Sequence, residues 1–282
     1  MWGRLEKPAP QYIGSGRPEK DEVSMSNRIP LVAANWKMYK TIPQAVAFAE
    51  ELQKEVGPCK DREITIGAPF TALAAVREVL QQTGFSLAAQ NCYWEDAGAY
   101  TGEVSPVMLQ DLGCRYVMVG HSERRQIFGE TDAMVQKKVA ALFRHKLLPI
   151  LCVGEVLVER EAGTTFTVVS TQLEMALQGL GRELAAQLVI AYEPVWAIGT
   201  GKTATPAQAQ EVHGFLREQC GTLYDKALAK QIRIVYGGSV KPDNVDSLMA
   251  EPDIDGLLVG GASLEMASFK RIVQYRKPGE AG

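Results

Sequence analysis

Residues that could carry out acid–base chemistry follow several short apolar runs of the sequence. They are Asn35 and Lys37, His121 and Glu123, Glu193, and the turns Gly237-Gly238-Ser239 and Gly260-Gly261. A carboxylate can accept a proton, an imidazole can donate one, and a lysine can hold negative charge. Glycine lets backbone N–H groups approach a ligand closely. Each residue alone also has an ordinary structural explanation, but their repeated position after apolar runs predicts one shared site.

Eight continuous apolar runs predict the strands that position these residues. Continuous runs, unlike alternating ones, are typical of strands covered on both faces, as in parallel sheets. The runs are residues 31–34, 64–66, 87–89, 116–119, 148–153, 188–191, 232–235 and 257–259. The candidate residues therefore follow strands 1, 4, 6, 7 and 8 at their carboxyl ends, where α/β folds bind ligands. Pro149 donates no ladder hydrogen bond, so it should mark the first residues of its strand.

Helical segments separate the apolar runs and predict a repeated βα fold. Within residues 44–56, spacings of three or four indicate one buried helical face, made of Val46, Ala49, Leu52 and Val56. Thr205 and Pro206 predict the start of another helix, as an N-cap residue and a proline at the first helical position. Periodicity alone leaves a closed barrel and an open doubly wound sheet equally possible.

Two segments near residue 200 resemble nucleotide-binding motifs but lack features that those motifs require. The segment Gly199-Thr200-Gly201-Lys202-Thr203 resembles the end of a phosphate-binding P-loop, but Trp196 stands where that motif requires its first glycine. A dinucleotide-binding glycine motif directly follows its strand, whereas Gly199 comes seven positions after Tyr192. We therefore expect neither segment to bind a nucleotide.

Composition excludes several other classes of protein. The 282 residues carry a formal net charge of −3 without a long basic run, which argues against nucleic acid as a partner. No apolar run approaches the roughly 20 residues that span a bilayer, so no membrane segment is expected. The cysteines lack CxxC spacing, which indicates a reduced, cytoplasmic protein without a metal site. They are Cys59, Cys92, Cys114, Cys152 and Cys220.

The first residues differ in composition from the rest of the chain. Residues 1–24 contain three prolines, three glycines and many charges, and they lack the apolar segment of a secretory signal. We expect residues 1–27 to be a disordered extension and residues 28–282 to be one catalytic domain. Met25 offers a second possible start, so the extension is either a tail or an over-extended gene. A chain that begins at Met25 should match the full chain in activity and melting temperature.

Five segments together resemble the triosephosphate isomerase family in their residues, order and spacing. They are NWKM at 35–38, GHSERR at 120–125, AYEPVWAIGTGK at 191–202, YGGSV at 236–240 and VGGA at 259–262. The resemblance extends over roughly residues 28–275. It implies a closed (β/α)8 barrel with no cofactor and no metal, usually a homodimer, which interconverts glyceraldehyde 3-phosphate and dihydroxyacetone phosphate in glycolysis and gluconeogenesis.

The same resemblance assigns roles to individual residues. It implies that Glu193 abstracts a substrate proton, that neutral His121 polarises the carbonyl, and that Lys37 holds negative charge. Asn35 would orient a substrate oxygen, and Glu123 would support the site from behind. The donors implied for the phosphate are Gly199, Ser239, Gly260 and Gly261. Tyr39 departs from the family, because many members carry a smaller polar residue there, and this bears on the subunit interface.

Two long connections carry further expectations. Residues 92–103 exceed the usual length of a connection between strand and helix and contain Tyr93, Trp94 and Tyr100. The resemblance implies that this loop inserts into a second subunit, where Thr101 approaches the partner subunit's Asn35 and Lys37. Residues 194–204 directly follow Glu193 and are expected to form a lid, with Ile198 as its apolar tip.

Two alternative functions compete with this interpretation. Another phosphate-binding barrel could catalyse a different aldose–ketose or lyase reaction, although the set of Glu193, His121 and Lys37 argues against it. A non-catalytic phosphosugar-binding or scaffold protein would be favoured by loss of the base, and Glu193 is present. Proton abstraction beside a carbonyl requires such a base, and preorganised donors must stabilise the enediolate that forms.

Overall fold

Eight parallel strands close into a barrel in the computed structural model, which describes residues 28–81, 83–198 and 203–276. The strands pair in sequence order, and β8 pairs with β1 to complete the ring. Their bounds are β1 Leu31–Asn35, β2 Glu63–Ala68, β3 Ser86–Ala89, β4 Tyr116–Val119, β5 Leu148–Val153, β6 Val189–Tyr192, β7 Arg233–Tyr236 and β8 Gly256–Val259. The closed barrel confirms the (β/α)8 fold and removes the open sheet as an alternative.

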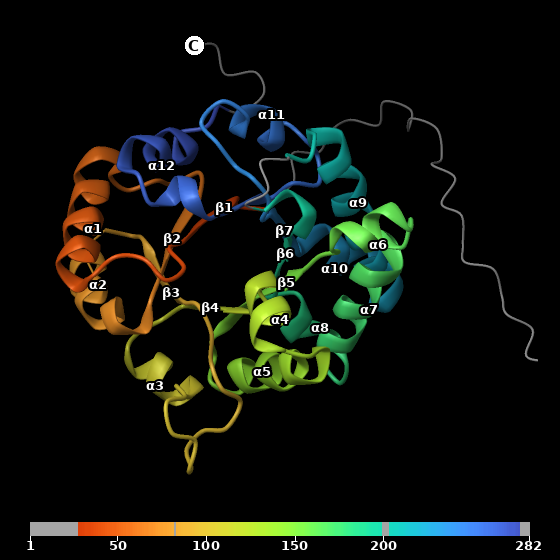
Figure 1. The fold of residues 1–282 in the computed structure, drawn as a ribbon, viewed down its shortest axis with the longest axis horizontal. Coiled ribbons are helices and arrows are strands. Elements are labelled where there is room, and N and C mark those ends of the chain that lie inside the picture. Colours follow the sequence, from red (N-terminus) through yellow and green to blue (C-terminus); the bar gives the residue numbers. More distant parts are fainter. Residues whose placement is uncertain (1–27, 82, 199–202, 277–282) are drawn as a thin grey trace, which may run out of the picture.

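Helices surround the barrel on its outside (Figure 1). The α-helices are α1 Ile42–Val56, α2 Leu73–Leu80, α3 Pro106–Asp111, α4 Ser122–Phe128, α5 Asp132–Arg144, α6 Leu157–Glu161, α7 Thr165–Leu177, α8 Arg182–Ala185, α9 Pro206–Leu223, α10 Lys226–Gln231, α11 Val245–Met249 and α12 Met266–Val273. Three short 3₁₀ helices are η1 Phe70–Ala72, η2 Val195–Ala197 and η3 Gly261–Ser263. The connection between β3 and α3 projects away from the barrel, at the lower edge of Figure 1.

Two apolar layers fill the molecule. The inner layer lies inside the barrel and includes Tyr116, Met118 and Ile150, all fully buried. The outer layer lies between strands and helices, and Phe269 of α12 and Leu52 of α1 are buried in it. Since each strand is covered on both sides, its residues are apolar without alternation, which is the pattern that the sequence displays.

The predicted helix over residues 44–56 is confirmed, but its predicted buried face is partly wrong. Ala45, Phe48, Ala49 and Leu52 are buried, whereas Val46 and Val56 are only half-buried. The helix begins at Ile42 and presents the face of positions 45, 48, 49 and 52 to the barrel. The aromatic ring of Phe48 packs edge-on against Trp36, with ring centres 5.3 Å apart, and this contact sets the rotation of the helix.

Other local predictions can be compared directly with the structure. The Thr205 side chain accepts a hydrogen bond from the Gln208 backbone N–H at 3.2 Å, which confirms the predicted N-cap of α9. Pro149 is the second residue of β5, as expected. After β8, η3 occupies residues 261–263 and α12 begins at Met266.

Residues 1–27, predicted to be an extension, lie outside the described residues. Within the described ranges, no helix is both long and apolar enough to cross a membrane. The same part of the chain holds no group of three or more His, Cys, Asp or Glu side chains arranged to bind a metal ion.

Candidate active site

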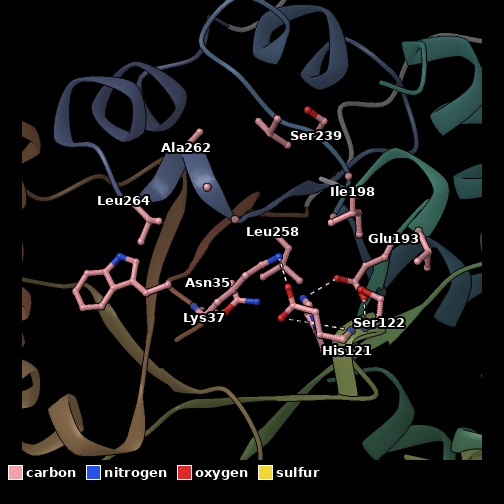
Figure 2. Close-up of a pocket in the computed structure, with 18 of the residues that line it drawn as sticks. Asn35, Lys37, His121, Ser122, Glu193, Ile198, Ser239, Leu258, Ala262 and Leu264 are labelled. Atoms are coloured by element: carbon pink, nitrogen blue, oxygen red, sulfur yellow. Dashed lines mark hydrogen bonds and ion pairs between the residues drawn. The ribbon is translucent and has the colours of Figure 1, made fainter. Parts of the chain in front are cut away.

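A cavity of about 1180 Å³ opens at the carboxyl ends of the strands. Asn35 and Lys37 reach it from β1, His121 from β4 and Glu193 from β6, while Ser239 follows β7 and Gly260 follows β8. Figure 2 shows Asn35, Lys37, His121 and Glu193 converging on the cavity, with Lys37 and Glu193 on opposite sides of His121. The structure therefore brings together the residues that the sequence placed at five separate strand ends.

Glu193 and His121 form a buried pair at the centre of this site. His121 Nε2 lies 3.0 Å from Glu193 Oε1. The second carboxylate oxygen of Glu193 accepts a hydrogen bond from the Ser122 backbone N–H at 2.9 Å. Burial raises the pKa of Glu193, but His121, the Ser122 N–H and the nearby charge of Lys37 together lower it below its ordinary value. Glu193 is therefore a carboxylate at neutral pH.

The position of the proton on His121 follows from its other nitrogen. Nδ1 accepts a hydrogen bond from the Glu123 backbone N–H at 3.2 Å, in the first turn of α4. A neutral ring in this position carries its proton on Nε2 and presents it to Glu193. Burial lowers the pKa of His121, and the Glu193 carboxylate outweighs burial and raises it. The N–H directed at Nδ1 opposes a second proton on the ring, and on this geometry we assign the neutral form.

Lys37 is held in an uncommon backbone conformation at the cavity wall. Its φ of 52° lies in the left-handed region, which costs a non-glycine residue roughly 1–2 kcal/mol. Its backbone N–H donates to Asn35 Oδ1 at 3.0 Å, and its ammonium lies 2.6 Å from Glu123 Oε1. The Asn35 side chain thus closes the turn that carries Lys37, and Glu123 pairs with the Lys37 charge.

Two glycine-containing turns, after β7 and β8, form another part of the cavity wall. In the first, the Ser239 carbonyl accepts a hydrogen bond from the Asn244 side chain at 2.9 Å. In the second, the Gly260 carbonyl accepts from the Ser263 hydroxyl at 2.7 Å. A Cβ at Gly260 would lie 3.4 Å from Lys37 Cε, at ordinary van der Waals distance, so the Lys37 side chain passes close to this turn.

Two more glycines allow the backbone around Glu193 to pack closely. A Cβ at Gly154, directly after β5, would lie 1.7 Å from the Glu193 carbonyl oxygen. A Cβ at Gly237 would lie 2.9 Å from Glu193 Cγ. The Glu193 backbone N–H also donates to the Val153 carbonyl at 2.8 Å. The ends of β5 and β7 therefore fix the position of Glu193 from both sides.

Comparison with known proteins agrees with this geometry. The sequence profile of the triosephosphate isomerase family matches residues 30–276. The chain belongs to the triosephosphate isomerase family. The triosephosphate isomerase of Chloroflexus aurantiacus is 55% identical over 249 residues, which cover 88% of this chain and 100% of that protein. Those of a Roseiflexus species and of Moorella thermoacetica are each 56% identical over 248 residues, covering 88% of this chain and 98% and 99% of the relatives.

The remaining residues expected from the family resemblance are distributed as follows. Glu123 contacts Lys37 and lines the cavity. Thr101 is exposed on the projecting connection between β3 and α3 and does not line the cavity. Gly199 and the rest of residues 199–202, within the expected lid, lie outside the described residues. In the first part of the expected lid, residues 195–197 form η2, and Ile198 lines the cavity.

Sequence reasoning missed several contacts that complete the site. The Ser122 backbone N–H, which binds Glu193, gives no signal in the identity of its side chain. Glu155 is fully buried and accepts hydrogen bonds from Tyr192 and from Trp196, at the start of the segment after Glu193. Burial raises the pKa of Glu155, against these hydrogen bonds. The only sign of this buried acid in the sequence is the order of residues around Gly154, with an apolar residue before it and the acidic Glu155 after it.

The other two histidines lie outside the cavity. His145 ends α5, and its Nε2 lies 2.8 Å from Asp96. His213 is fully buried in α9, and burial lowers its pKa to about 4. We therefore assign both histidines a structural role.

Proposed function

We propose that the chain interconverts glyceraldehyde 3-phosphate and dihydroxyacetone phosphate by proton transfer through an enediolate. The observation that carries the proposal is the buried contact of 3.0 Å between His121 Nε2 and Glu193 Oε1 in a cavity that Lys37 also lines. This places a carboxylate base, a hydrogen-bond donor and a cation around one small ligand. The relatives named above as triosephosphate isomerases support the same reaction.

In this proposal Glu193 moves the proton. Its lowered pKa keeps it ionised, and its burial removes the water that would weaken it as a base. The single Nε2 proton of neutral His121 can serve Glu193 or a substrate oxygen, but not both. We infer that the bound carbonyl oxygen takes this donor, which releases Glu193 to accept a proton from the adjacent carbon. A positioned base of this kind contributes about 10²–10⁴-fold in rate.

The charge that develops during the reaction is stabilised by the neighbouring side chains. His121 donates to the enediolate oxygen, and the Lys37 ammonium stands beside it as the cation. Asn35, which already fixes the Lys37 turn, would orient a substrate oxygen. Glu123, paired with Lys37 at 2.6 Å, would hold that lysine in place without touching substrate. Preorganised donors of this kind contribute on the order of 10²–10³ each.

The phosphate group is assigned to the glycine-containing turns. Backbone N–H groups near Ser239, Gly260 and Gly261 suit a dianion, since such amides bind phosphate without a metal. Gly199 completes this set in the proposal. The reaction consumes no cofactor, because one substrate carbon loses a proton and its neighbour gains one, so no external oxidant or reductant is needed. We place the activity in the cytoplasm, in glycolysis and gluconeogenesis, with a triose phosphate as the ligand and neither nucleic acid nor membrane as a partner.

Substituting the base tests the proposal directly. Glu193→Gln keeps the shape of the side chain but removes the proton acceptor, so turnover should fall at least about 10³-fold with an unchanged circular dichroism spectrum. Lys37→Met should nearly abolish activity, because a dianionic substrate loses its nearest cation. Glu211→Gln, at an exposed position of α9, is the matched control and should retain full activity. A Glu193→Gln enzyme with near-native turnover would rule out the proposed base.

We also propose that the protein acts as a homodimer. The projecting connection between β3 and α3 is ordered by its own aromatic side chains, with the rings of Tyr93 and Trp94 4.1 Å apart and those of Tyr93 and Tyr100 4.5 Å apart. Large apolar side chains are exposed on this loop and near the cavity, and Met38 is 94% exposed. They are Met38, Tyr39, Tyr100, Val107, Met108, Ile127 and Phe128. Large apolar side chains that are exposed in this way on a single chain are typical of a subunit interface.

In the proposed dimer, the loop of one subunit covers the Lys37 turn of the other. Thr101 would then approach the partner subunit's Asn35 and Lys37, and Tyr39 would be buried between the subunits. Sedimentation velocity at micromolar concentration should show a species of twice the chain mass. A fully active monomer under these conditions would contradict the dimer and leave the role of Thr101 without support.

A further inference from the structure

Two lysines in the turn after β1 have left-handed backbone conformations. We define the β1 turn as residues 36–40 and the β8 turn as residues 260–265. Lys37 has a φ of 52° and Lys40 a φ of 73°. Lys37 lines the cavity, whereas Lys40 does not. A glycine would adopt the conformation of residue 40 without strain. The strained lysine at this position therefore requires an account that the proposed chemistry does not supply.

The Lys40 side chain connects the β1 turn to the β8 turn. Its ammonium donates a hydrogen bond to the Leu264 carbonyl at 3.0 Å. The same nitrogen lies 4.2 Å from the centre of the Phe48 ring and 5.4 Å from the centre of the Trp36 ring. These distances are within the range of cation–π attraction. One side chain thus contacts the β8 turn, the first helix and the beginning of its own turn.

The two turns also meet at a second point, on the cavity side. The Lys37 side chain passes over Gly260, where an added Cβ would lie 3.4 Å from Lys37 Cε. Strands β1 and β8 are paired directly below, with Ala34 opposite Val259. Ala262 and Leu264 of the β8 turn line the same cavity as Lys37. Lys37 and the Gly260 and Gly261 amides face the ligand from these two turns. Lys40 joins the same two turns on the side away from the cavity.

We propose that Lys40 is a positioning residue that fixes the β8 turn against the β1 turn, so that Lys37 and the glycine amides bind the substrate phosphate together. This inference rests on the function proposed above. Lys40 does not touch substrate in this account, since it lies outside the cavity lining. Glycine at residue 40 would remove the strain, but it would supply neither the hydrogen bond nor the ring contacts.

The surroundings of Lys40 are consistent with a fixed cation. Burial lowers the pKa of Lys40, and the Glu265 carboxylate at the end of the β8 turn opposes that effect. The charge is thus kept by the same turn that the side chain holds. A hydrogen bond from a charged donor is stronger than a neutral one, so its loss should be felt in the position of the turn.

Three substitutions separate the contact from the strain. Lys40→Met keeps a residue with a side chain in the left-handed backbone conformation and keeps the apolar stem, but it removes the hydrogen-bond donor and the charge. Lys40→Gly removes the strain as well, which protects the test against a variant that fails to fold. Lys40→Arg keeps a cationic donor. Lys146 supplies the matched control, because it is an exposed lysine with a φ of 57° at the end of α5, remote from the cavity.

The measurements compare ligands with and without a phosphate group. For glyceraldehyde 3-phosphate, we expect KM to rise about tenfold in Lys40→Met and Lys40→Gly, with kcat changed less than threefold, and to stay within about threefold of wild type in Lys40→Arg. Binding of inorganic phosphate, followed by isothermal titration calorimetry, should weaken by the same factor of about ten, or about 1.4 kcal/mol. Turnover of D-glyceraldehyde, which lacks the phosphate, should change less than twofold. Lys146→Gly should leave all of these values unchanged.

The outcomes distinguish this inference from the proposed function. A wild-type chain without isomerase activity would refute the proposed function. An active wild type whose Lys40→Met and Lys40→Gly variants keep native KM and phosphate affinity would refute only the positioning role. A lowered melting temperature with equal losses for glyceraldehyde 3-phosphate and glyceraldehyde would show a general structural role and would also overturn the inference.

Discussion

Substituting Gly237 with alanine should displace the catalytic base without disturbing the barrel. Gly237 follows β7, and its backbone N–H donates to the Tyr192 carbonyl at 2.7 Å. Its φ is not among the positive values, so alanine can adopt the same backbone conformation. The added Cβ would lie 2.9 Å from Glu193 Cγ and 3.3 Å from the Tyr192 carbonyl oxygen. The only severe contact is therefore with the side chain of Glu193.

The size of the effect follows from that contact. Ordinary van der Waals contact begins at 3.4 Å, so Glu193 Cγ must move by about 0.5 Å. A misplacement of about 1 Å in a reacting group costs roughly 10²-fold, so a shift of half that size should cost about tenfold in kcat. KM should change less than about threefold, because the phosphate turns and Lys37 keep their positions. Steady-state kinetics in both directions of the reaction measure these values.

A matched control separates displacement of the base from the general effect of removing a glycine. Gly181 precedes α8 with a φ of −69°, and a Cβ there would meet no atom within 4 Å. Gly181→Ala should keep native kcat and KM. If Gly237→Ala also kept native kcat, the inference that the close approach of β7 fixes Glu193 would be wrong. A loss of kcat together with a melting temperature lowered by many degrees would show that the barrel itself had been disturbed.

Two further predictions concern pH dependence and stability. In His121→Gln, Glu193 loses the strongest of the interactions that lower its pKa while its burial remains, so the pKa of Glu193 rises. The acid limb of the kcat/KM profile should then move to higher pH than in wild type. An unchanged acid limb would show that His121 does not set this pKa. Gly214→Ala, inside α9, should raise the free energy of unfolding by about 0.5–1 kcal/mol and the melting temperature by about 1–4 °C. The new Cβ fits, because it would lie 3.6 Å from its nearest neighbour, at ordinary van der Waals distance. A destabilised variant in thermal melts would contradict this reasoning.

The sequence alone predicted the strands well because their residues carry the signal locally. Each of the eight apolar runs begins within one residue of the start of a strand, and the prediction that Pro149 is among the first residues of its strand is confirmed. Closure of the barrel was different. It depends on β8 pairing with β1, a contact between opposite ends of the domain that no local pattern contains. Only the resemblance to a family supplied it.

The candidate site was predictable in its side chains but not in its backbone contacts. Glu193, His121 and Lys37 are recognisable because their types are unusual after strands. The Ser122 N–H that binds Glu193 belongs to every residue type, and the role of Lys40 depends on a carbonyl more than 220 positions away along the chain. The rotation of α1 also depended on packing, since Phe48 rather than Val46 contacts Trp36.

The contact between Gly154 and Glu193 limits how this enzyme could evolve. Every side chain other than hydrogen at residue 154 would overlap the Glu193 carbonyl, so the position accepts no substitution while the base stays in place. A new reaction that needs the base elsewhere would have to move the ends of β5 and β6 together, which takes several simultaneous changes. Libraries aimed at new substrates therefore do better to keep Gly154 and vary exposed cavity residues outside the proposed subunit interface, such as Asp243.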